Sequence, residues 1–295
     1  MNNLTKNVIL TPFNILYRLS PAAALKLMFR LKHGFRLDLD NPRTFTEKLQ
    51  WIKLNDKNPL MPECCDKYAV RAFVEKQGCG ELLNHLIWEG FDPEEIPFDD
   101  LPGRFVLKIT HGSTFNIICR DKEQLNRDEV IKKCRRWLRE QYLICYGEWF
   151  YGKVRPRIII EDYLEDKSSG KPDLIDYKVF CFNGRPDYIR VMSERTSGLQ
   201  EAMYDTQWNL LEGKSMGYPL SNERIECPEC LDQMMEAARR LSSPFLHARV
   251  DFYVVNGKLY FGEITFTSGA GFHKFGSYEF DLEVGSRLEL CDEQC

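Results

Sequence analysis

The chain has 295 residues, 43% of them hydrophobic and 28% charged, which suits a soluble protein of two or three packed lobes. No apolar run approaches the ~20 residues that span a bilayer, and the first residues, MNNLTKNVILTPFN, lack the cleavage site of a signal peptide. We therefore expect a cytoplasmic protein, and with a net charge of only −4 we expect no nucleic-acid partner.

Residues 1–36 are strongly basic. They contain six Lys or Arg residues and neither Asp nor Glu, although the whole chain has a net charge of −4. Such asymmetry predicts an anionic partner. The partner would be the inner face of the membrane, an acidic glycan or another protein. The alternative is a basic face packed against the acidic body of the same chain. The basic residues are Lys6, Arg18, Lys26, Arg30, Lys32 and Arg36.

Four helices are predicted in the first half of the chain. Ser20-Pro21 is an N-cap followed by proline, and Gly34 ends that helix. A second helix begins in NPRTFTEKLQWIKLND with Thr44 or Thr46 as its cap. The others are DKYAVRAFVEKQG, from Asp66 to Gly78, and the amphipathic stretch from Asn126 to Tyr142.

The second half is rich in strands. After the short β-rich run RFVLKI come RIIIEDYL, DYKVFCFNG, PDYIRVMSE, ARVDFYVV and KLYFGEITF, with one helix, CLDQMMEAARRLS, among them. Asn256-Gly257 is a strong two-residue hairpin turn between the last two strands. Helices segregated from antiparallel pairs predict an α+β fold and not a doubly wound parallel sheet.

The predicted hairpin gathers charged and hydroxyl side chains. Strand alternation places Arg249, Asp251 and Tyr253 on one face of the first strand, and Glu263, Thr265 and Thr267 on one face of the second. Closing the turn brings Asp251 opposite Glu263 or one step away. Carboxylates in an apolar sheet need a counter-ion, and oxygen ligands suit Mg²⁺. The alternative is a solvated strand face with ordinary charges.

Two further motifs are weaker. Lys108 ends the strand RFVLKI and is followed by Thr110-His111-Gly112-Ser113-Thr114, a turn able to present N–H groups and a charge to phosphates. Cys227-Pro-Glu-Cys230, completed by Cys291 and Cys295, would make a zinc site, but we interpret all eleven cysteines as ordinary reduced thiols.

Taken together, these motifs resemble the ATP-grasp superfamily, and most closely its teichuronopeptide-biosynthesis (TupA-type) branch. The resemblance runs from about Phe45 to Leu290 through FTEKLQW, CDKYAVR, LPGRFVLKITHGS, RIIIEDYL, DYKVFCFNG and RVDFYVVNGKLYFGEITFTSGAG. The last motif is also similar to the end of the D-alanine–D-alanine ligase pattern. The resemblance implies two α+β lobes that enclose ATP: a basic helical region at 1–62, a small lobe with the phosphate loop at 63–164, and a large lobe with the metal site at 165–295.

The resemblance also implies roles for single residues. Asp251 and Glu263 match the metal carboxylates, Thr265 stands in place of an asparagine, and Arg249 matches the arginine at the transferred phosphoryl group. The expected ATP contacts are Arg71, Lys108, His111, Gly112, Ser113, Glu161, Asp162, Tyr163, Leu164, Asp176 and Lys178. Thr267, Ser268 and Gly269 would border the acyl phosphate, and Arg190 and Arg195 would hold a substrate carboxylate or pair with the acidic body.

The implied activity is an ATP- and Mg²⁺-dependent ligation of a carboxylate to an amine through an acyl phosphate, in bacterial surface polysaccharide (capsule) biosynthesis. A uronic acid and an amino acid or amine are the expected substrates. Three alternatives stay open: an ATP-dependent sugar kinase, a metal-dependent glycosyltransferase and a binding module with a vestigial ATP site. The sequence gives no oligomeric state.

Overall fold

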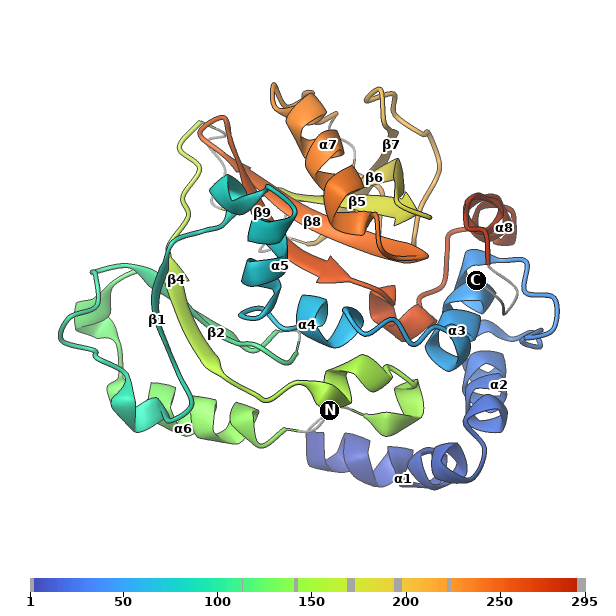
Figure 1. Ribbon diagram of the computed structural model, residues 1–295, viewed down its shortest axis with the longest axis horizontal. Helices are drawn as coiled ribbons and strands as arrows, with labels where there is room; N and C mark the ends of the chain where they lie inside the picture. Colours follow the sequence, from blue (N-terminus) through green and yellow to red (C-terminus); the bar gives the residue numbers. More distant parts are fainter. Residues whose placement is uncertain are drawn as a thin grey trace.

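Two antiparallel sheets form the framework of the protein (Figure 1). The computed structural model describes residues 3–112, 114–140, 143–168, 173–193, 198–221 and 224–290. The smaller sheet has the order β1 (Leu86–Gly90), β4 (Ile158–Asp162), β2 (Phe105–Ile109), β3 (Asn116–Cys119). The larger sheet has the order β7 (Gln200–Asp205), β6 (Arg185–Ser193), β5 (Asp176–Phe182), β8 (His247–Val255), β9 (Lys258–Thr265). Antiparallel pairing throughout both sheets confirms the predicted α+β class.

The described residues contain eight α-helices and several short 3-10 helices. The α-helices are α1 (Asn3–Leu19), α2 (Pro21–His33), α3 (Phe45–Asn55), α4 (Met61–Cys65), α5 (Val70–Lys76), α6 (Arg127–Leu138), α7 (Leu231–Ser242) and α8 (Tyr278–Arg287). The 3-10 helices are η1 (Gly80–Leu82), η2 (Pro93–Glu95), η3 (Lys122–Gln124), η4 (Ile144–Tyr146), η5 (Trp149–Lys153) and η6 (Ser268–Gly271). None of the described helices is long and apolar enough to cross a membrane.

The predicted helix caps are confirmed. The Ser20 side chain accepts a hydrogen bond from the Ala23 N–H at the start of α2, and Gly34 ends this helix with φ 89°. Thr44, and not Thr46, caps α3 and forms a capping box with Glu47. These ends depend on contacts within one helical turn, which explains why sequence alone predicts them.

Two predicted helix boundaries were wrong, and several elements were not predicted. The helix predicted from Asp66 begins only at Val70, because Asp66 Oδ1 instead accepts from the Tyr68 and Ala69 N–H groups and forms a turn. The helix predicted to reach Tyr142 ends at Leu138, and Tyr142 lies outside the described residues. Helix α1 and strands β1, β3 and β7 were not predicted, since their local patterns are weak.

Each sheet has its own apolar core. Helix α7 lies along one face of the larger sheet and contacts β5, β6 and β8, whereas α6 packs on the smaller sheet through Val130 and Cys134 (Figure 1). Helices α4 and α5 lie between the two sheets in this view. The predicted limits of the lobes at residues 62 and 164 stay predictions.

Candidate active site

The β8–β9 hairpin positions the two acidic residues that the sequence singled out. Asn256 and Gly257, with φ values of 50° and 78°, make the predicted two-residue turn. The ladder then pairs Asp251 directly with Glu263 and Arg249 with Thr265. Gly262 is the extra residue of a bulge between these pairs and the turn. The predicted juxtaposition of the two carboxylates is therefore present.

Asp251 is buried and held by two cations. Arg249 donates to both carboxylate oxygens, from Nε at 2.6 Å and from Nη2 at 2.7 Å, and Lys178 Nζ lies 2.5 Å from Oδ2. Burial alone would raise the pKa of Asp251, but the charges of Arg249 and Lys178 outweigh it and lower that pKa. Burial lowers the pKa of Lys178, against the raising effect of Asp251. Asp176 lies 3.7 Å from the same lysine.

Glu263 is the more open of the two carboxylates, with 39% of its side chain exposed against 2% for Asp251. Its Oε2 lies 3.6 Å from Lys67 Nζ and its Oε1 lies 3.5 Å from Arg249 Nη2. Burial would raise its pKa, but Lys67, Arg249 and Lys178 together hold the pKa below the ordinary value. Glu263 therefore stays ionised and faces a cavity of about 700 Å³.

The donor set suits a divalent cation. Asp251, Glu263 and Thr265 offer only oxygen atoms, which is the ligand type that Mg²⁺ prefers. Within the described residues, Lys67, Lys178 and Arg249 surround these oxygens with positive charge at distances of 2.5 to 3.6 Å. These side chains already balance the two carboxylates, so their additional positive charge suits phosphate oxygens, and a divalent cation would share Asp251 and Glu263 with them. Glu263, which lines the cavity, is the carboxylate that such a cation would reach.

Glu161, the predicted hinge residue, forms ion pairs with two other predicted ATP contacts, Lys108 and Arg71. This buried glutamate lies on β4 and accepts from Lys108 Nζ at 2.6 Å and from Arg71 Nη1 at 3.2 Å. Strands β2 and β4 are neighbours, which brings Lys108 beside Glu161. Arg71 also donates to the Asn84 carbonyl at 2.8 Å. The three predicted ATP-contacting residues thus form one partly buried ion-pair cluster.

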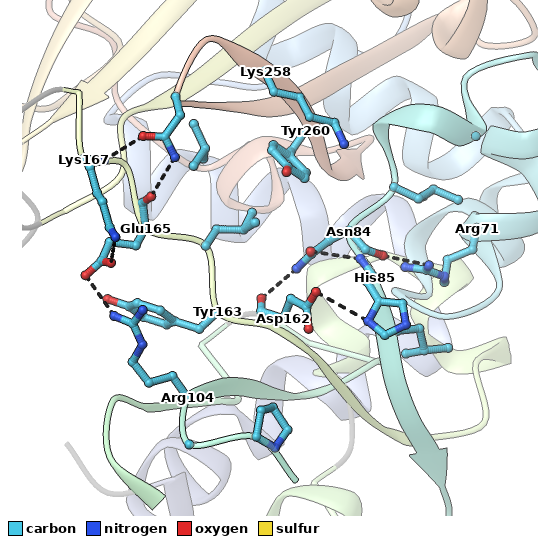
Figure 2. Close-up of a pocket in the computed structure, with 18 of the residues that line it drawn as sticks. Arg71, Asn84, His85, Arg104, Asp162, Tyr163, Glu165, Lys167, Lys258 and Tyr260 are labelled. Atoms are coloured by element: carbon cyan, nitrogen blue, oxygen red, sulfur yellow. Dashed lines mark hydrogen bonds and ion pairs between the residues drawn. The ribbon is translucent and has the colours of Figure 1, made fainter.

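A larger cavity of about 1060 Å³ opens beside this cluster, between β1, the end of β4 and the tip of the β8–β9 hairpin. Figure 2 shows Lys258 and Tyr260 on one side of it, Tyr163 and Arg104 on the other, and Asn84 between them. Asn84 Nδ2 donates to the Asp162 carbonyl at 2.8 Å, which fixes the chain as it leaves β4.

Residues 163 and 164 follow this fixed point. In the described part of the chain, neither the N–H nor the carbonyl of Leu164 has a backbone partner, and Tyr163 and Leu164 both line the cavity. Free backbone groups beside a cavity can pair with the polar edge of a planar ring. This suits the backbone role predicted for the residues that end at Leu164. Glu161, predicted at the adenine amino group, is instead paired with Lys108 and Arg71 and is not among the residues that line this cavity.

The β2–β3 turn borders the smaller cavity. His111 Nε2 lies 2.9 Å from the Glu140 carbonyl, and the Gly112 carbonyl accepts from Lys67 Nζ at 2.7 Å. Burial lowers the pKa of His111. Ser113, the next predicted contact, lies outside the described residues. Lys67 thereby joins this turn to Glu263 across the cavity.

The loop after β9 closes the same cavity. Arg249 Nη1 donates to Ser268 Oγ at 2.8 Å, and Thr267 Oγ1 donates to Glu148 Oε1 at 2.5 Å. Gly269 and Ala270 both have φ 56°, a left-handed conformation that is strained for alanine. The loop is held from below by α3, whose Lys53 donates to the Ala270 carbonyl at 2.7 Å.

Arg190, one of the two predicted substrate arginines, follows the second of its predicted alternatives. Arg190 is buried, and its Nε donates to Glu201 Oε2 at 2.5 Å, so it pairs with the acidic body, as one of the two predicted alternatives has it. Arg195 lies outside the described residues, as do Cys291 and Cys295. Within the described chain, no group of three metal-binding His, Cys, Asp or Glu side chains forms around Cys227 or elsewhere.

Sequence reasoning missed several residues of the site. Lys67 stands in the quoted motif CDKYAVR, but Arg71 was chosen from it; the structure places Lys67 at the smaller cavity and Arg71 at the larger one. Glu148 and Tyr151 line the smaller cavity without a local signal, because they reach it from a distant segment. Asn84, which fixes the end of β4, is likewise set by tertiary contacts alone.

Comparisons with known proteins agree with this geometry. The family model described as TupA-like ATP-grasp matches residues 47–289, so the chain belongs to the TupA-like ATP-grasp family and is an ATP-dependent ligase. The comparison with curated proteins found no match.

Among solved structures, the chain is similar to D-alanine–D-alanine ligase from Bacillus anthracis complexed with ATP, at 18% identity and TM-score 0.42, covering 76% of this chain and 68% of that one. It is also similar to L-amino acid ligase from Bacillus licheniformis, at 13% identity and TM-score 0.48, covering 86% and 57%. A third similar structure is phosphoribosylamine–glycine ligase from Thermotoga maritima, at 13% and TM-score 0.43, covering 76% and 51%.

Proposed function

We propose that this ATP-grasp protein joins a carboxylate to an amine through an acyl phosphate, with Mg²⁺ held by Asp251 and Glu263. The observation that carries the proposal is the position of Arg249. Its guanidinium donates to Asp251, to Thr265 Oγ1 at 3.0 Å and to Ser268 Oγ, and it lines the smaller cavity together with Glu263. A rigid cation is thus fixed beside a carboxylate pair at the wall of a cavity.

We place ATP across the two cavities. Its adenine would lie in the larger cavity against the backbone of Tyr163 and Leu164, and its phosphates would reach Lys67 and the turn at His111 and Gly112 in the smaller one. Lys108, the predicted phosphate contact, is paired with Glu161. The β8–β9 hairpin borders both cavities: Asp251 lies at the level of the smaller one and Asn256 at the larger one. The five residue steps from Asp251 to Asn256 correspond to about 16 Å of strand. Mg²⁺, when bound, would neutralise phosphate charge and favour transfer of the terminal phosphoryl group.

The protein's own groups position and stabilise the reacting atoms. A substrate carboxylate oxygen bonds to the terminal phosphorus and ADP leaves; the amine nitrogen then bonds to the acyl carbon and phosphate leaves with the former carboxylate oxygen. Arg249 stabilises negative charge that develops in both transition states, because its orientation is fixed before the substrate binds. The His273 ring also lines the cavity, and in its neutral form it would be the candidate acceptor of the amine proton, although burial and Arg190 lower its pKa and so weaken it as a base.

The substrates we propose are a uronic acid and an amino acid or amine, in the biosynthesis of a surface polysaccharide. Support for this part comes from the family resemblance alone. The carboxylate would lie between Arg249 and the loop Thr267–Gly269, and Glu148, which accepts from Thr267 at 2.5 Å, would attract a positively charged amine.

The decisive experiment combines ADP release with trapping by hydroxylamine. We expect ADP release that requires Mg²⁺, a uronic acid and an amine together, and a hydroxamate when hydroxylamine replaces the amine. The matched variant is Glu263→Gln, which keeps the shape of the side chain and should abolish both signals; Asp251→Asn should do the same. Glu279→Gln on α8 serves as the control, since this glutamate lies outside both cavities.

Three outcomes would contradict the proposal. ADP release with a sugar and no hydroxamate would indicate transfer to a hydroxyl group, as in a sugar kinase. Normal turnover by Glu263→Gln would show that this carboxylate holds no metal. ATP binding without turnover in any carboxylate and amine pair would indicate a binding module.

A further inference from the structure

Helices α1 and α2 present an unusual outer surface. Nine large hydrophobic side chains are exposed in the described part of the protein, and five of them lie on these two helices. They are Ile9, Ile15, Leu19, Leu27 and Leu31, with exposed fractions from 42% to 80%. We call these five residues, together with Arg18, Lys26 and Arg30, the basic apolar surface.

The apolar exposure is not a consequence of loose docking. Helix α2 buries Ala24, Leu25, Met28 and Phe29 against the body, and on α1 Leu10, Phe13 and Tyr17 pack on the same cluster. Asn14 further accepts a hydrogen bond from the Cys145 N–H at 3.0 Å. Both helices are therefore anchored by one face, and Leu27 and Leu31, one turn apart, lie outside the anchored face of α2 and are exposed.

The charges of this surface are unpartnered by the protein. No ion pair in the described residues joins Arg18, Lys26 or Arg30 to an acidic side chain, and residues 1–36 contain no Asp or Glu at all. The alternative that this basic segment packs against the acidic body of the chain is therefore not what the structure shows for these three residues. In Figure 1 both helices lie along the outer edge of the molecule, away from α7.

We propose that the basic apolar surface binds an anionic phospholipid bilayer and holds the protein at the membrane. Aliphatic side chains beside Lys and Arg on an anchored helix match both layers of a bilayer interface: the Leu and Ile side chains enter the acyl boundary and the cations contact the headgroups. An acidic glycan offers the charge but no apolar phase for five aliphatic side chains. A bilayer takes up both.

The surface also lies close to the candidate active site. Lys32, one residue beyond Leu31 on α2, lines the smaller cavity. Membrane attachment through α1 and α2 would therefore hold the opening of this cavity near the bilayer. The proposal of membrane binding does not depend on the ligase activity proposed above, because binding to vesicles needs neither ATP nor substrate.

The test is co-sedimentation of the full chain with vesicles of phosphatidylglycerol and phosphatidylcholine, and with vesicles of phosphatidylcholine alone. We expect binding to the anionic vesicles that weakens as salt increases, and little binding to the neutral ones. Lys26→Glu with Arg30→Glu should weaken binding by about 25-fold or more, on the basis of about five-fold for each basic residue. Leu27→Ser with Leu31→Ser should weaken it by about ten-fold.

Matched controls are available elsewhere on the surface. Leu220→Ser changes a leucine with the same 42% exposure as Leu27, and Arg239→Glu with Arg240→Glu changes two cations on α7. Both controls should bind vesicles like the wild type. Circular dichroism would show that all variants are folded.

Three results would overturn the proposal. The first is equal binding to neutral and anionic vesicles, or none to either. The second is binding to a soluble polyuronate that the leucine variants leave unchanged. The third is a concentration-dependent dimer that the leucine variants dissociate, which would make this surface an interface between two copies.

Discussion

Lys67 Nζ lies 3.6 Å from Glu263 Oε2, across the cavity that separates the β2–β3 turn from the β8–β9 hairpin. The same ammonium group donates to the Gly112 carbonyl at 2.7 Å. One lysine thus contacts the turn expected to hold phosphates and the carboxylate expected to hold the metal. Its charge stands where the negative charge of a nucleotide would accumulate.

Replacing Lys67 should therefore impair the reaction more than the fold. Lys67→Met is expected to lower kcat/KM for ATP by about 100-fold, in the range found for single preorganised donors. Because 21% of the side chain is exposed, the free energy of unfolding should change by less than about 1 kcal/mol. ADP release and urea unfolding would measure the two effects. Lys57→Met is the control, and an equal loss of activity in both variants would contradict the assignment.

The two paired carboxylates should differ in their contribution to stability. Asp251→Asn leaves Arg249 and Lys178 buried around an uncharged amide, and we expect a loss of about 3 kcal/mol or more in the free energy of unfolding. Glu263→Gln, at a half-exposed position, should cost less than about 1 kcal/mol. Urea titrations would compare them.

A second change should restore part of the stability lost in Asp251→Asn. Adding Lys178→Met removes one of the two uncompensated cations, so the double variant should unfold at a higher urea concentration than the single one. If the losses of unfolding free energy in the two single variants simply add in the double variant, the Asp251–Lys178 ion pair contributes little to the stability of the protein.

Arg249 should affect rate more than ATP binding. Arg249→Lys keeps a positive charge but loses the two-point contact with Asp251, because an ammonium group cannot form that fork. We expect kcat to fall by about 100-fold and the Kd of ATP to change by less than about 3-fold, since the lost contact matters most in the transition state. Single-turnover kinetics and equilibrium ATP titration would separate the two. A large rise in Kd with an unchanged kcat would assign Arg249 to ATP binding instead.

Asp281 should make stability depend on pH. Burial raises its pKa to about 6, although the Thr46 hydroxyl and N–H both donate to the carboxylate. The folded state therefore binds a proton more tightly than the unfolded state, whose Asp has a pKa near 3.8. The stabilising contribution is complete below about pH 3.8 and is lost as the pH rises through about 6.

Asp281→Asn keeps the shape of the side chain without the titration. The difference in unfolding free energy between variant and wild type should therefore change by about 2 kcal/mol between pH 4 and pH 7, in favour of the variant at pH 7. Urea unfolding at a series of pH values would measure it. A difference that stays constant with pH would show that Asp281 keeps an ordinary pKa.

The β8–β9 hairpin, and which residues share each of its faces, could be predicted from local sequence alone. Asn256 and Gly257 adopt the left-handed turn that their residue types favour, and the two-residue period of a strand then places Asp251 opposite Glu263. The caps of α2 and α3 were predictable for the same reason. All of these features depend on neighbours in the chain or on one turn between two strands.

Which charged side chains surround that hairpin depends instead on contacts between segments that are distant in the chain. Lys67, Glu148 and His273 reach one cavity from three separate segments, and Glu161 is shared by Lys108 and Arg71 because β2 pairs with β4 and α5 packs beside them. The sequence pattern showed the basic charge of residues 1–36, but not which side chains of α1 and α2 face outward. Such contacts depend on how distant elements pack, and no local periodicity records that packing.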